Sequence, residues 1–289
     1  MKEVKLFTPE QVLNGQDPAP LSDFNLQFLA QGDSWFSIGA IPPTLTTNLF
    51  DGMGTSTVRA CAVNCATPGA QLSLMANTTR APQFIAFLNG HQSRRWGGLL
   101  LSGGGNDLIA AAQQAPANPA DLRLLATADE WTNAPGGERY LSNAGWQTFS
   151  NHLAAVFENL LVARDSGENA GLPIVIHTYD RAIARDAGAG LSFGPWLFPA
   201  MNAFGIPDAD RPDVCRVLLD RLQTLIDHIA DTTPDGSIHV VHAQGTLTPA
   251  RTSDTGSTAD WQNEIHPTRQ GYRKLSAFWQ PVLDAVFNA

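Results

Sequence analysis

The sequence predicts a three-layer α/β/α sandwich built on a five-stranded, mostly parallel sheet. Short apolar runs of strand length alternate along the chain with longer segments whose apolar residues recur at helical spacing. Several of the short runs are apolar throughout, which is typical of strands that helices cover on both faces. With 289 residues, the chain is long enough for one domain of this kind.

Each expected element follows from one of these patterns. The five expected strands are, in chain order, residues 25–30, 58–65, 98–101, 173–177 and 238–242. Three expected helices span residues 146–164, 212–230 and 268–286. Pro212 suits the first turn of the second helix. Thr268 is the expected N-cap of the last helix.

Two long segments have no place in this core and predict loop insertions. Residues 110–145 are rich in Ala, Pro, Asn and Gly, and residues 181–211 include a run of aromatic residues. Each comes after an expected strand, so each is expected to lie over the carboxyl end of the sheet. Loops of this length are usually functional or disordered. We expect one domain over residues 1–289 with these two insertions.

Composition and charge exclude several classes of protein. Apolar residues make up 43% of the chain and charged residues 16%, which excludes a disordered protein. A net charge of −9 argues against a nucleic-acid partner and against docking on anionic lipid. The first residues contain no apolar run of signal-peptide length, and no stretch is long enough to span a bilayer, so we expect a cytoplasmic protein. The three cysteines are expected to be buried free thiols, and no metal site is expected.

The first candidate for chemistry is a serine at the end of the first expected strand. Ser34 stands in Gly32-Asp33-Ser34, directly after the apolar run. Open α/β sheets build their sites at the carboxyl ends of their strands. Ser34 is therefore a candidate nucleophile. The alternative interpretation is an ordinary turn in which the serine caps the following helix.

A second motif follows the third expected strand. Gly104-Gly105-Asn106-Asp107 offers close backbone approach and places the amide of Asn106 near the same sheet edge as Ser34. The alternative is a tight turn that Asn106 or Asp107 caps. A phosphate-binding loop is excluded, because neither of its glycine patterns is present.

The third motif is a histidine near the C-terminus. Pro267 disfavours the helical region for His266, so His266 is expected on an extended turn ahead of the last helix. This position exposes the imidazole, which is then a candidate general base. The alternative is a surface histidine at a helix entry.

Together these motifs resemble those of the SGNH (GDSL-type) hydrolases. Gly32-Asp33-Ser34 matches the first block of that family, Gly69 the glycine of the second, Gly104 to Asp107 the third, and His266 the histidine of the last. The blocks come in the family's order and span most of the chain. The resemblance implies a flavodoxin-like α/β fold and hydrolysis of esters or thioesters without a metal or other cofactor. It also implies Ser34 as nucleophile, His266 as base, and an oxyanion hole made by the backbone N–H groups of Ser34 and Gly69 and the side-chain amide of Asn106.

One position departs from the family pattern. Asn263 stands three residues before His266, where the family has an aspartate. A carboxylate there would orient the imidazole and stabilise its protonated form, whereas Asn supplies an acceptor without charge. Three interpretations remain: Asp260 or Glu264 is the acid, with Asp260 preferred; a Ser-His dyad suffices, with Asn263 or a backbone carbonyl orienting the ring; or the chain is an altered variant without activity.

The substrate is expected to be a small-molecule ester, with Trp35, Trp196 and Phe198 as candidate binding residues. Residues 193–198 are interpreted either as a wall or lid for an apolar acyl group or as a satellite hydrophobic cluster. Two alternative functions keep the same catalytic residues: an acyltransferase and a carbohydrate deacetylase. An alternative of another class is a non-catalytic binding module, in which Trp35, Trp196 and Trp261 provide stacking surfaces.

Overall fold

The computed structural model describes residues 1–16, 18–37, 47–190 and 193–288. Within these residues, one sheet has six strands in the order β2–β5–β3–β6–β7–β8, and all of its pairings are parallel. A short antiparallel pair, β1 with β4, lies apart from it. The strands are β1 (Lys2–Glu3), β2 (Lys5–Phe7), β3 (Leu26–Gly32), β4 (Gly54–Thr55), β5 (Ala60–Asn64), β6 (Gly98–Ser102), β7 (Ile174–His177) and β8 (Ile238–Val241).

The five expected strands are present, but the expected total is wrong by one, because β2 adds a sixth strand to the sheet. β2 contains only three residues, and its burial changes from exposed at Lys5 to buried at Phe7. It forms the edge of the sheet and pairs with β5 alone. A run this short has too few apolar residues to stand out as a strand in the sequence.

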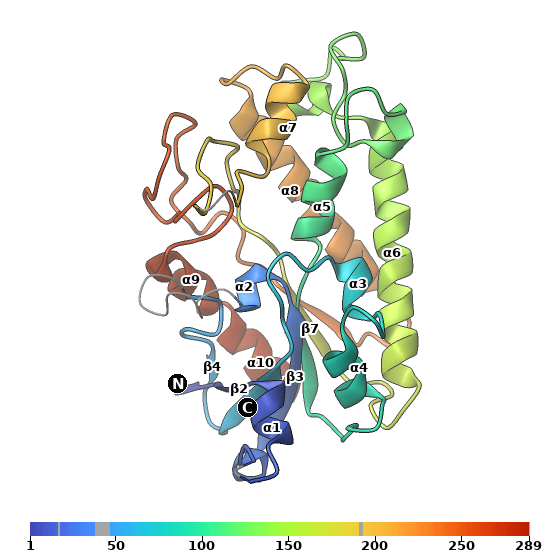
Figure 1. Ribbon diagram of the computed structural model, residues 1–289, viewed down its shortest axis with the longest axis vertical. Helices are drawn as coiled ribbons and strands as arrows, with labels where there is room; N and C mark the ends of the chain where they lie inside the picture. The colour runs from blue at the N-terminus through green and yellow to red at the C-terminus, as the bar shows by residue number, and fades with distance from the viewer. Residues whose placement is uncertain (17, 38–46, 191–192, 289) are drawn as a thin grey trace.

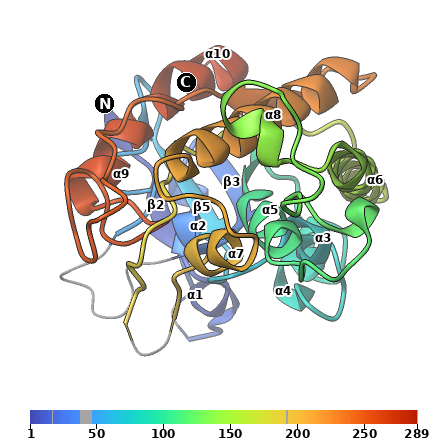
Figure 2. The ribbon, with the colours of Figure 1, turned by 90° about the horizontal axis from the view of Figure 1, so that it is seen from above.

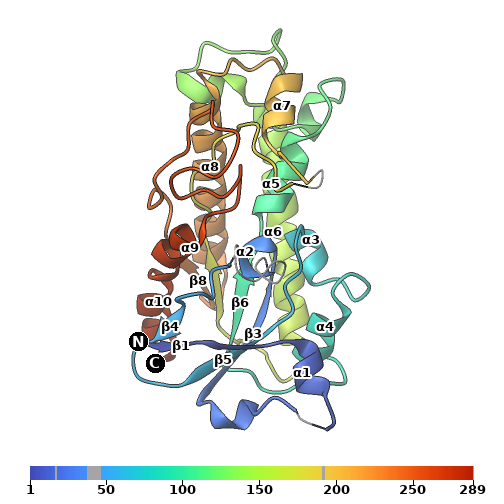
Figure 3. The same ribbon diagram turned by 60° about the vertical axis from the view of Figure 1, so that its left-hand side comes forward.

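Helices cover both faces of the sheet, as the three-layer prediction requires. Figure 3 shows α8, α9 and α10 on one side of the strands and α1, α4 and α6 on the other. Every residue of β6 is buried as a result. The helices are α1 (Pro9–Leu13), α2 (Ser34–Ser37), α3 (Leu72–Met75), α4 (Pro82–Leu88), α5 (Gly105–Ala112), α6 (Asn143–Asp165), α7 (Phe198–Ala203), α8 (Arg211–Thr232), α9 (Arg269–Ser276) and α10 (Trp279–Phe287).

The last expected helix is broken into two. α9 begins where predicted, and the Thr268 hydroxyl accepts the Gly271 N–H at 3.1 Å as its N-cap. The chain then leaves the helix after Ser276 and starts α10 at Trp279. Pro281 accounts for the break, because it has no N–H to donate to a carbonyl four residues earlier. In the first turn of a new helix this missing donor costs nothing.

The order of the strands places a crevice beside β3. The chain passes from β3 to β5 on one side, returns across β3 to β6, and continues to β7 on the other side. The connections that leave β3 and β6 therefore diverge. In open α/β sheets, ligands bind at the carboxyl ends of two such strands. Ser34 follows β3 and Asn106 follows β6, so both lie at this switch point.

The two predicted insertions contain short helical turns. Residues 110–145 include the end of α5 and 3₁₀ turns at Ala120–Leu122 and Gly136–Tyr140. Residues 181–211 include α7, and two residues of this segment, Leu191 and Ser192, lie outside the described residues. In Figure 1, α7 and the green turns that precede α6 lie beyond the ends of the strands. Figure 2, seen from above, shows α7 next to α5.

Candidate active site

Ser34 sits in a tight turn between β3 and the short helix α2. The strands β3 and β6 approach closely here, and a Cβ on Gly32 would lie 2.7 Å from the Cβ of Ser102. Glycine is therefore required at this position. Asp33 holds the turn, because its Oδ1 accepts the Trp35 N–H at 2.9 Å. Ser34 begins α2 at the carboxyl end of β3, where the sequence places it.

His266 lies against Ser34, although the two residues are far apart in the sequence. The distance from His266 Nε2 to Ser34 Oγ is 2.8 Å. The indole N–H of Trp35 donates to the Ile265 carbonyl at 3.2 Å, which ties the serine turn to the histidine loop. The sequence predicted an exposed imidazole at this position ahead of a helix, but His266 is buried, with 5% of its surface accessible. Burial lowers the pKa of His266 to about 4, so the ring is neutral at neutral pH.

Asn263 fixes the tautomer of this histidine. Its Oδ1 lies 3.0 Å from His266 Nδ1 and also accepts the backbone N–H groups of Ile265 and His266, at 3.2 and 2.9 Å. The two backbone groups can only donate, so the atom they contact is the amide oxygen. An oxygen beside Nδ1 requires a proton on Nδ1. Nε2 is then left as the acceptor that faces Ser34.

The two carboxylates considered as the acid lie elsewhere. Asp260 Oδ2 pairs with Lys274 Nζ at 2.6 Å and accepts the Thr248 N–H at 2.8 Å. Burial raises the pKa of Asp260, but these donors outweigh it, and the pKa lies below its ordinary value. The geometry therefore contradicts the preference for Asp260, because α9 supplies a lysine that takes its carboxylate.

Glu264 anchors the segment that precedes α7. Its carboxylate accepts backbone N–H groups from Arg185, Trp196, Leu197 and Phe198, those of Leu197 and Phe198 at 2.9 and 2.7 Å. Burial raises the pKa of Glu264, and these four donors oppose the rise. Glu264 therefore connects the histidine loop to the chain around Leu197 and does not contact the imidazole.

Arg185 holds the backbone of the loop that carries His266. It is fully buried, and its guanidinium donates to the carbonyls of Asn263, Asp254 and Gly256 at 2.7, 3.0 and 2.6 Å. The backbone of Asn263 is therefore fixed as well as its side chain. Nothing in the sequence pattern around Arg185 indicates this role.

The three expected oxyanion donors lie along the ends of β3, β5 and β6. Within the described residues, the backbone N–H groups of Ser34 and Gly69 donate to no protein acceptor. The Thr67 N–H donates to the Gly32 carbonyl at 2.9 Å, and Asn106 Nδ2 donates to the Ala70 carbonyl at 3.1 Å. The loop that carries Gly69 therefore contacts both the serine turn and Asn106. Gly69 itself has a φ of +76°, which favours glycine, and a Cβ there would meet no atom within 4 Å.

A narrow cavity opens beside Ser34. Its volume is about 40 Å³, and Ser34, Trp35 and Asn106 form part of its lining. The rest of the wall is mainly aliphatic and comes from α5, α8 and the segments before α7 and α9: Leu108, Ile109, Ala182, Leu197, Leu219 and Ile265. These residues were not predicted, since residues that line a cavity have the same pattern as residues of a filled core.

Of the three expected substrate-binding residues, one lines this cavity. Trp35 does so, and its ring also stacks on His177 with centroids 5.5 Å apart. The rings of Trp196 and His266 are nearly perpendicular, with their centroids 5.2 Å apart. Phe198 is not among the lining residues, and its ring lies under the guanidinium of Arg211 at 5.0 Å. Trp261, a stacking surface in the binding-module alternative, is buried.

A buried hydrogen-bond chain lies directly beneath the serine turn. Ser102 Oγ is 2.8 Å from both Asp33 Oδ1 and His177 Nε2, and His177 Nδ1 is 3.1 Å from the Thr178 carbonyl. The Tyr179 hydroxyl donates to Asp33 Oδ2 at 2.5 Å. The Ser102 hydroxyl has one hydrogen, so it can donate to Asp33 or to His177 but not to both. When Asp33 is ionised and His177 is neutral, one of these two contacts therefore lacks a proton, and a further proton on either group would complete it.

Burial shifts the pKa values of the two groups in opposite directions. It raises the pKa of Asp33 to about 6 and lowers the pKa of His177 to about 4. As the pH falls, the Asp33 carboxyl therefore takes up a proton before the imidazole does. No feature of the sequence pattern predicts this series of hydrogen bonds, because its residues come from the ends of three different strands.

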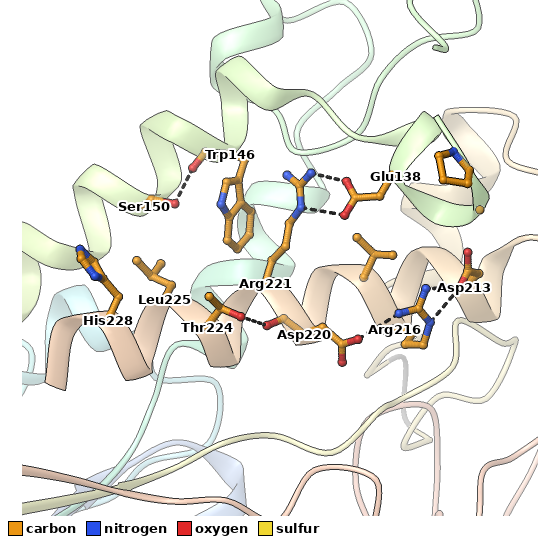
Figure 4. Close-up of a pocket in the computed structure, with 13 residues that line it drawn as sticks. Glu138, Trp146, Ser150, Asp213, Arg216, Asp220, Arg221, Thr224, Leu225 and His228 are labelled. Carbon is orange, nitrogen blue, oxygen red and sulfur yellow. Dashed lines mark hydrogen bonds and ion pairs between the residues drawn. The ribbon is translucent and has the colours of Figure 1, made fainter. Parts of the chain in front are cut away.

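A larger cavity of about 650 Å³ lies between α6 and α8, away from Ser34 (Figure 4). Its charged side chains are paired with one another. Arg221 bonds to Glu138 and lies over the Trp146 ring at 5.5 Å, and Arg216 pairs with Asp213 at 2.5 Å. Its lining contains His228 and Ser150, but the Ser150 hydroxyl donates to the Trp146 carbonyl at 2.8 Å. No serine of this cavity faces a histidine base.

In the described part of the chain, no three His, Cys, Asp or Glu residues are grouped so as to hold a metal ion. Across the same residues, no helix combines the length and apolar character needed to cross a membrane. The three cysteines are buried and unpaired.

Comparison with known proteins gives similar structures but no similar sequence. No protein-family model matches the chain, and no curated protein does. The chain is similar in structure to a protein described as a GDSL-like lipase from Parabacteroides merdae, with 13% identity, coverage of 91% of this chain and 96% of that chain, and a TM-score of 0.46.

Two further structures give comparable values. An extracellular lipase from Streptomyces rimosus has 15% identity, coverage of 90% and 99%, and a TM-score of 0.43. A catalytic mutant of an acetylxylan esterase from Geobacillus stearothermophilus has 13% identity, coverage of 91% and 94%, and a TM-score of 0.45.

Proposed function

We propose that this chain is a serine hydrolase of the SGNH type that cleaves carboxylic esters through an acyl-enzyme on Ser34. The observation that carries the proposal is the contact of 2.8 Å between Ser34 Oγ and His266 Nε2, with Asn263 Oδ1 3.0 Å from the other ring nitrogen. A hydroxyl, an unprotonated ring nitrogen and a group that orients the ring are the parts that nucleophilic catalysis requires.

The mechanism proceeds in two halves. Ser34 Oγ attacks the acyl carbon while its proton passes to His266 Nε2, and His266 then gives that proton to the departing alcohol. In the second half, His266 takes a proton from water, the hydroxide attacks the acyl-enzyme, and the proton returns to Ser34 as the acid leaves.

The oxyanion formed in each half is proposed to accept hydrogen bonds from the Ser34 and Gly69 N–H groups and the Asn106 amide. Two observations support this assignment: the two backbone donors have no protein acceptor in the described residues, and Asn106 Nδ2 uses one of its two hydrogens on Ala70. Loss of one oxyanion donor typically costs about 10²–10³ in kcat. Asn106→Ala is expected to lower kcat by this factor.

Asn263 is the proposed third member, in place of a carboxylate. It orients the ring and selects its tautomer, but it adds no negative charge beside the imidazolium that forms during the reaction. The low pKa of His266, about 4, agrees with the lack of a neighbouring carboxylate. The enzyme is therefore expected to work at low pH and to be slower than one with an aspartate in this position.

Hydrolysis of p-nitrophenyl acetate by Ser34→Ala tests the proposal. The variant is expected to lose at least about 10³-fold in kcat while its circular dichroism spectrum is unchanged. Ser37→Ala is the matched control, because it removes another hydroxyl of α2, one that donates to the Asp33 carbonyl at 2.7 Å rather than facing His266. Equal turnover by Ser34→Ala and the wild type would refute the assignment of the nucleophile.

A further inference from the structure

The cavity beside Ser34 has the shape and chemistry of a binding site for a small apolar group. It shares Ser34 and Asn106 with the proposed catalytic machinery, and aliphatic side chains of α5 and α8 supply much of its wall. Access to the site is limited, since only 6% of the Ser34 surface and 5% of the His266 surface are accessible. A group bonded to the carbon that Ser34 attacks can therefore enter this cavity.

The two carboxylates in the lining are already satisfied. Asp33 is hydrogen-bonded to Tyr179, Ser102 and Trp35. Asp180 accepts the backbone N–H groups of Arg181, Gly245 and Leu247, each at 2.7 Å. The cavity lining contains no lysine or arginine. A charged acyl group would therefore lose its hydration without gaining a partner, whereas an apolar group loses nothing.

The volume of the cavity limits the length of that group. An apolar protein cavity of about 150 Å³ takes up a benzene ring, which has six carbon atoms. The cavity beside Ser34, at about 40 Å³, has about a quarter of that volume and so accommodates only a few heavy atoms. Three atoms beyond the acyl carbon correspond to a butyryl group, and one corresponds to an acetyl group.

The wall is held in place from several sides. Leu108, Leu197 and Leu219 are buried, and protein interiors relax only partly around added atoms. The Leu197 N–H donates to Glu264 Oε2 at 2.9 Å, so this part of the wall is fastened to the loop that carries His266. A longer acyl chain would have to displace packed side chains or shift this loop.

We infer that the cavity lined by Leu108, Leu197 and Leu219 is the acyl pocket and that it restricts the enzyme to esters of short, uncharged acyl groups, from acetyl to butyryl. This inference rests on the proposed function, because it assigns the pocket to the acyl half of an ester attacked by Ser34. It names the substrate class that the catalytic residues alone leave open.

The test is a series of p-nitrophenyl esters with acyl chains of two to ten carbons. The wild type is expected to have its highest kcat/KM between two and four carbons and to lose at least tenfold by eight carbons. Leu219→Ala removes three carbon atoms from the wall and is expected to move the optimum by about two carbons. It should raise kcat/KM for the hexanoate relative to the acetate at least tenfold.

Leu218→Ala is the matched control, since Leu218 is also a buried leucine of α8 but does not line the cavity. It loses the same side-chain atoms and should keep the wild-type chain-length profile. If Leu219→Ala folds poorly, the milder Leu219→Val is expected to shift the optimum in the same direction, and the wild-type profile is itself a test.

Different results would refute the acyl pocket and the proposed function. A wild-type enzyme that hydrolyses the esters through Ser34 but prefers eight or more carbons would overturn the acyl pocket and leave the proposed function intact. An enzyme that hydrolyses no ester of the series faster than Ser34→Ala would overturn the proposed function, and the acyl pocket with it.

Discussion

Asn263→Asp is the perturbation that this site makes most informative, because it adds a charge without changing the geometry. The new carboxylate would take the place of the amide oxygen 3.0 Å from His266 Nδ1. It would also accept the same two backbone N–H groups, from Ile265 and His266, so the buried charge would enter a position that already has donors.

The size of the effect follows from the charge alone. An opposite charge at this distance typically shifts a pKa by about 1–3 units, which is about 1.4–4 kcal/mol in favour of the imidazolium. In serine proteases the reverse change, from Asp to Asn, lowers the rate about 10⁴-fold, partly because the ring adopts the wrong tautomer. Here Asn263 already selects the productive tautomer. Asn263→Asp is therefore expected to raise kcat/KM by about 10- to 10³-fold, which is less than the factor of about 10⁴ in the serine proteases.

The assay is kcat/KM for p-nitrophenyl acetate between pH 4 and pH 9. The wild-type rate should fall only as the pH approaches about 4, where His266 takes up a proton, and Asn263→Asp should move this acid limb to higher pH. Asn263→Ala is the control, because it removes both the orienting oxygen and the acceptor of two backbone N–H groups, and it should lower the rate. A variant Asn263→Asp with an unmoved acid limb and no gain in rate would refute the role given to this residue.

Three further predictions concern residues around the site. Asp260→Asn should lower stability by about 1–3 kcal/mol in urea denaturation, through loss of the ion pair with Lys274, but leave kcat/KM within about threefold of the wild type; a 10³-fold loss would restore Asp260 as the acid. Glu264→Gln should lower both Tm and kcat, since an amide offers one acceptor oxygen to the four N–H groups that now meet the carboxylate; unchanged values of both would contradict the anchoring role. Burial lowers the pKa of His177 from its ordinary value of 6.5 to about 4. Between these two pH values the imidazole takes up a proton when the protein unfolds, so the free energy of unfolding decreases as the pH falls from 6.5 towards 4. His177→Gln should therefore reduce the slope of unfolding free energy against pH in this window by about 1.4 kcal/mol per unit, and an identical slope in both proteins would contradict the buried neutral ring.

Local patterns in the sequence predicted the elements of the core well. The runs that became β3, β5, β6, β7 and β8 are apolar because helices cover both sides of them, and this requirement is visible in the sequence itself. β2 was missed because an edge strand of three residues has little apolar surface to bury. The break between α9 and α10 was predictable from Pro281, which cannot continue a helix.

The third member of the site shows where sequence reasoning stops. The expectation of a carboxylate beside His266 favoured Asp260, but an ion pair with Lys274, fourteen residues further along the chain, directs that carboxylate elsewhere. The role of Asn263 depends on two backbone N–H groups that fix its amide, and such geometry has no sequence signal. The same holds for Leu197 and Leu219, which differ from ordinary core residues only in facing a cavity.

The central claim is that Ser34 is a nucleophile activated by His266, and covalent labelling tests it most directly. Intact-mass and peptide mass spectrometry after treatment with a fluorophosphonate should show a single adduct on the peptide that contains Ser34. The adduct should be absent from Ser34→Ala and form much more slowly in His266→Ala. A protein that takes up no label at Ser34, or takes it up equally fast without His266, would contradict the claim.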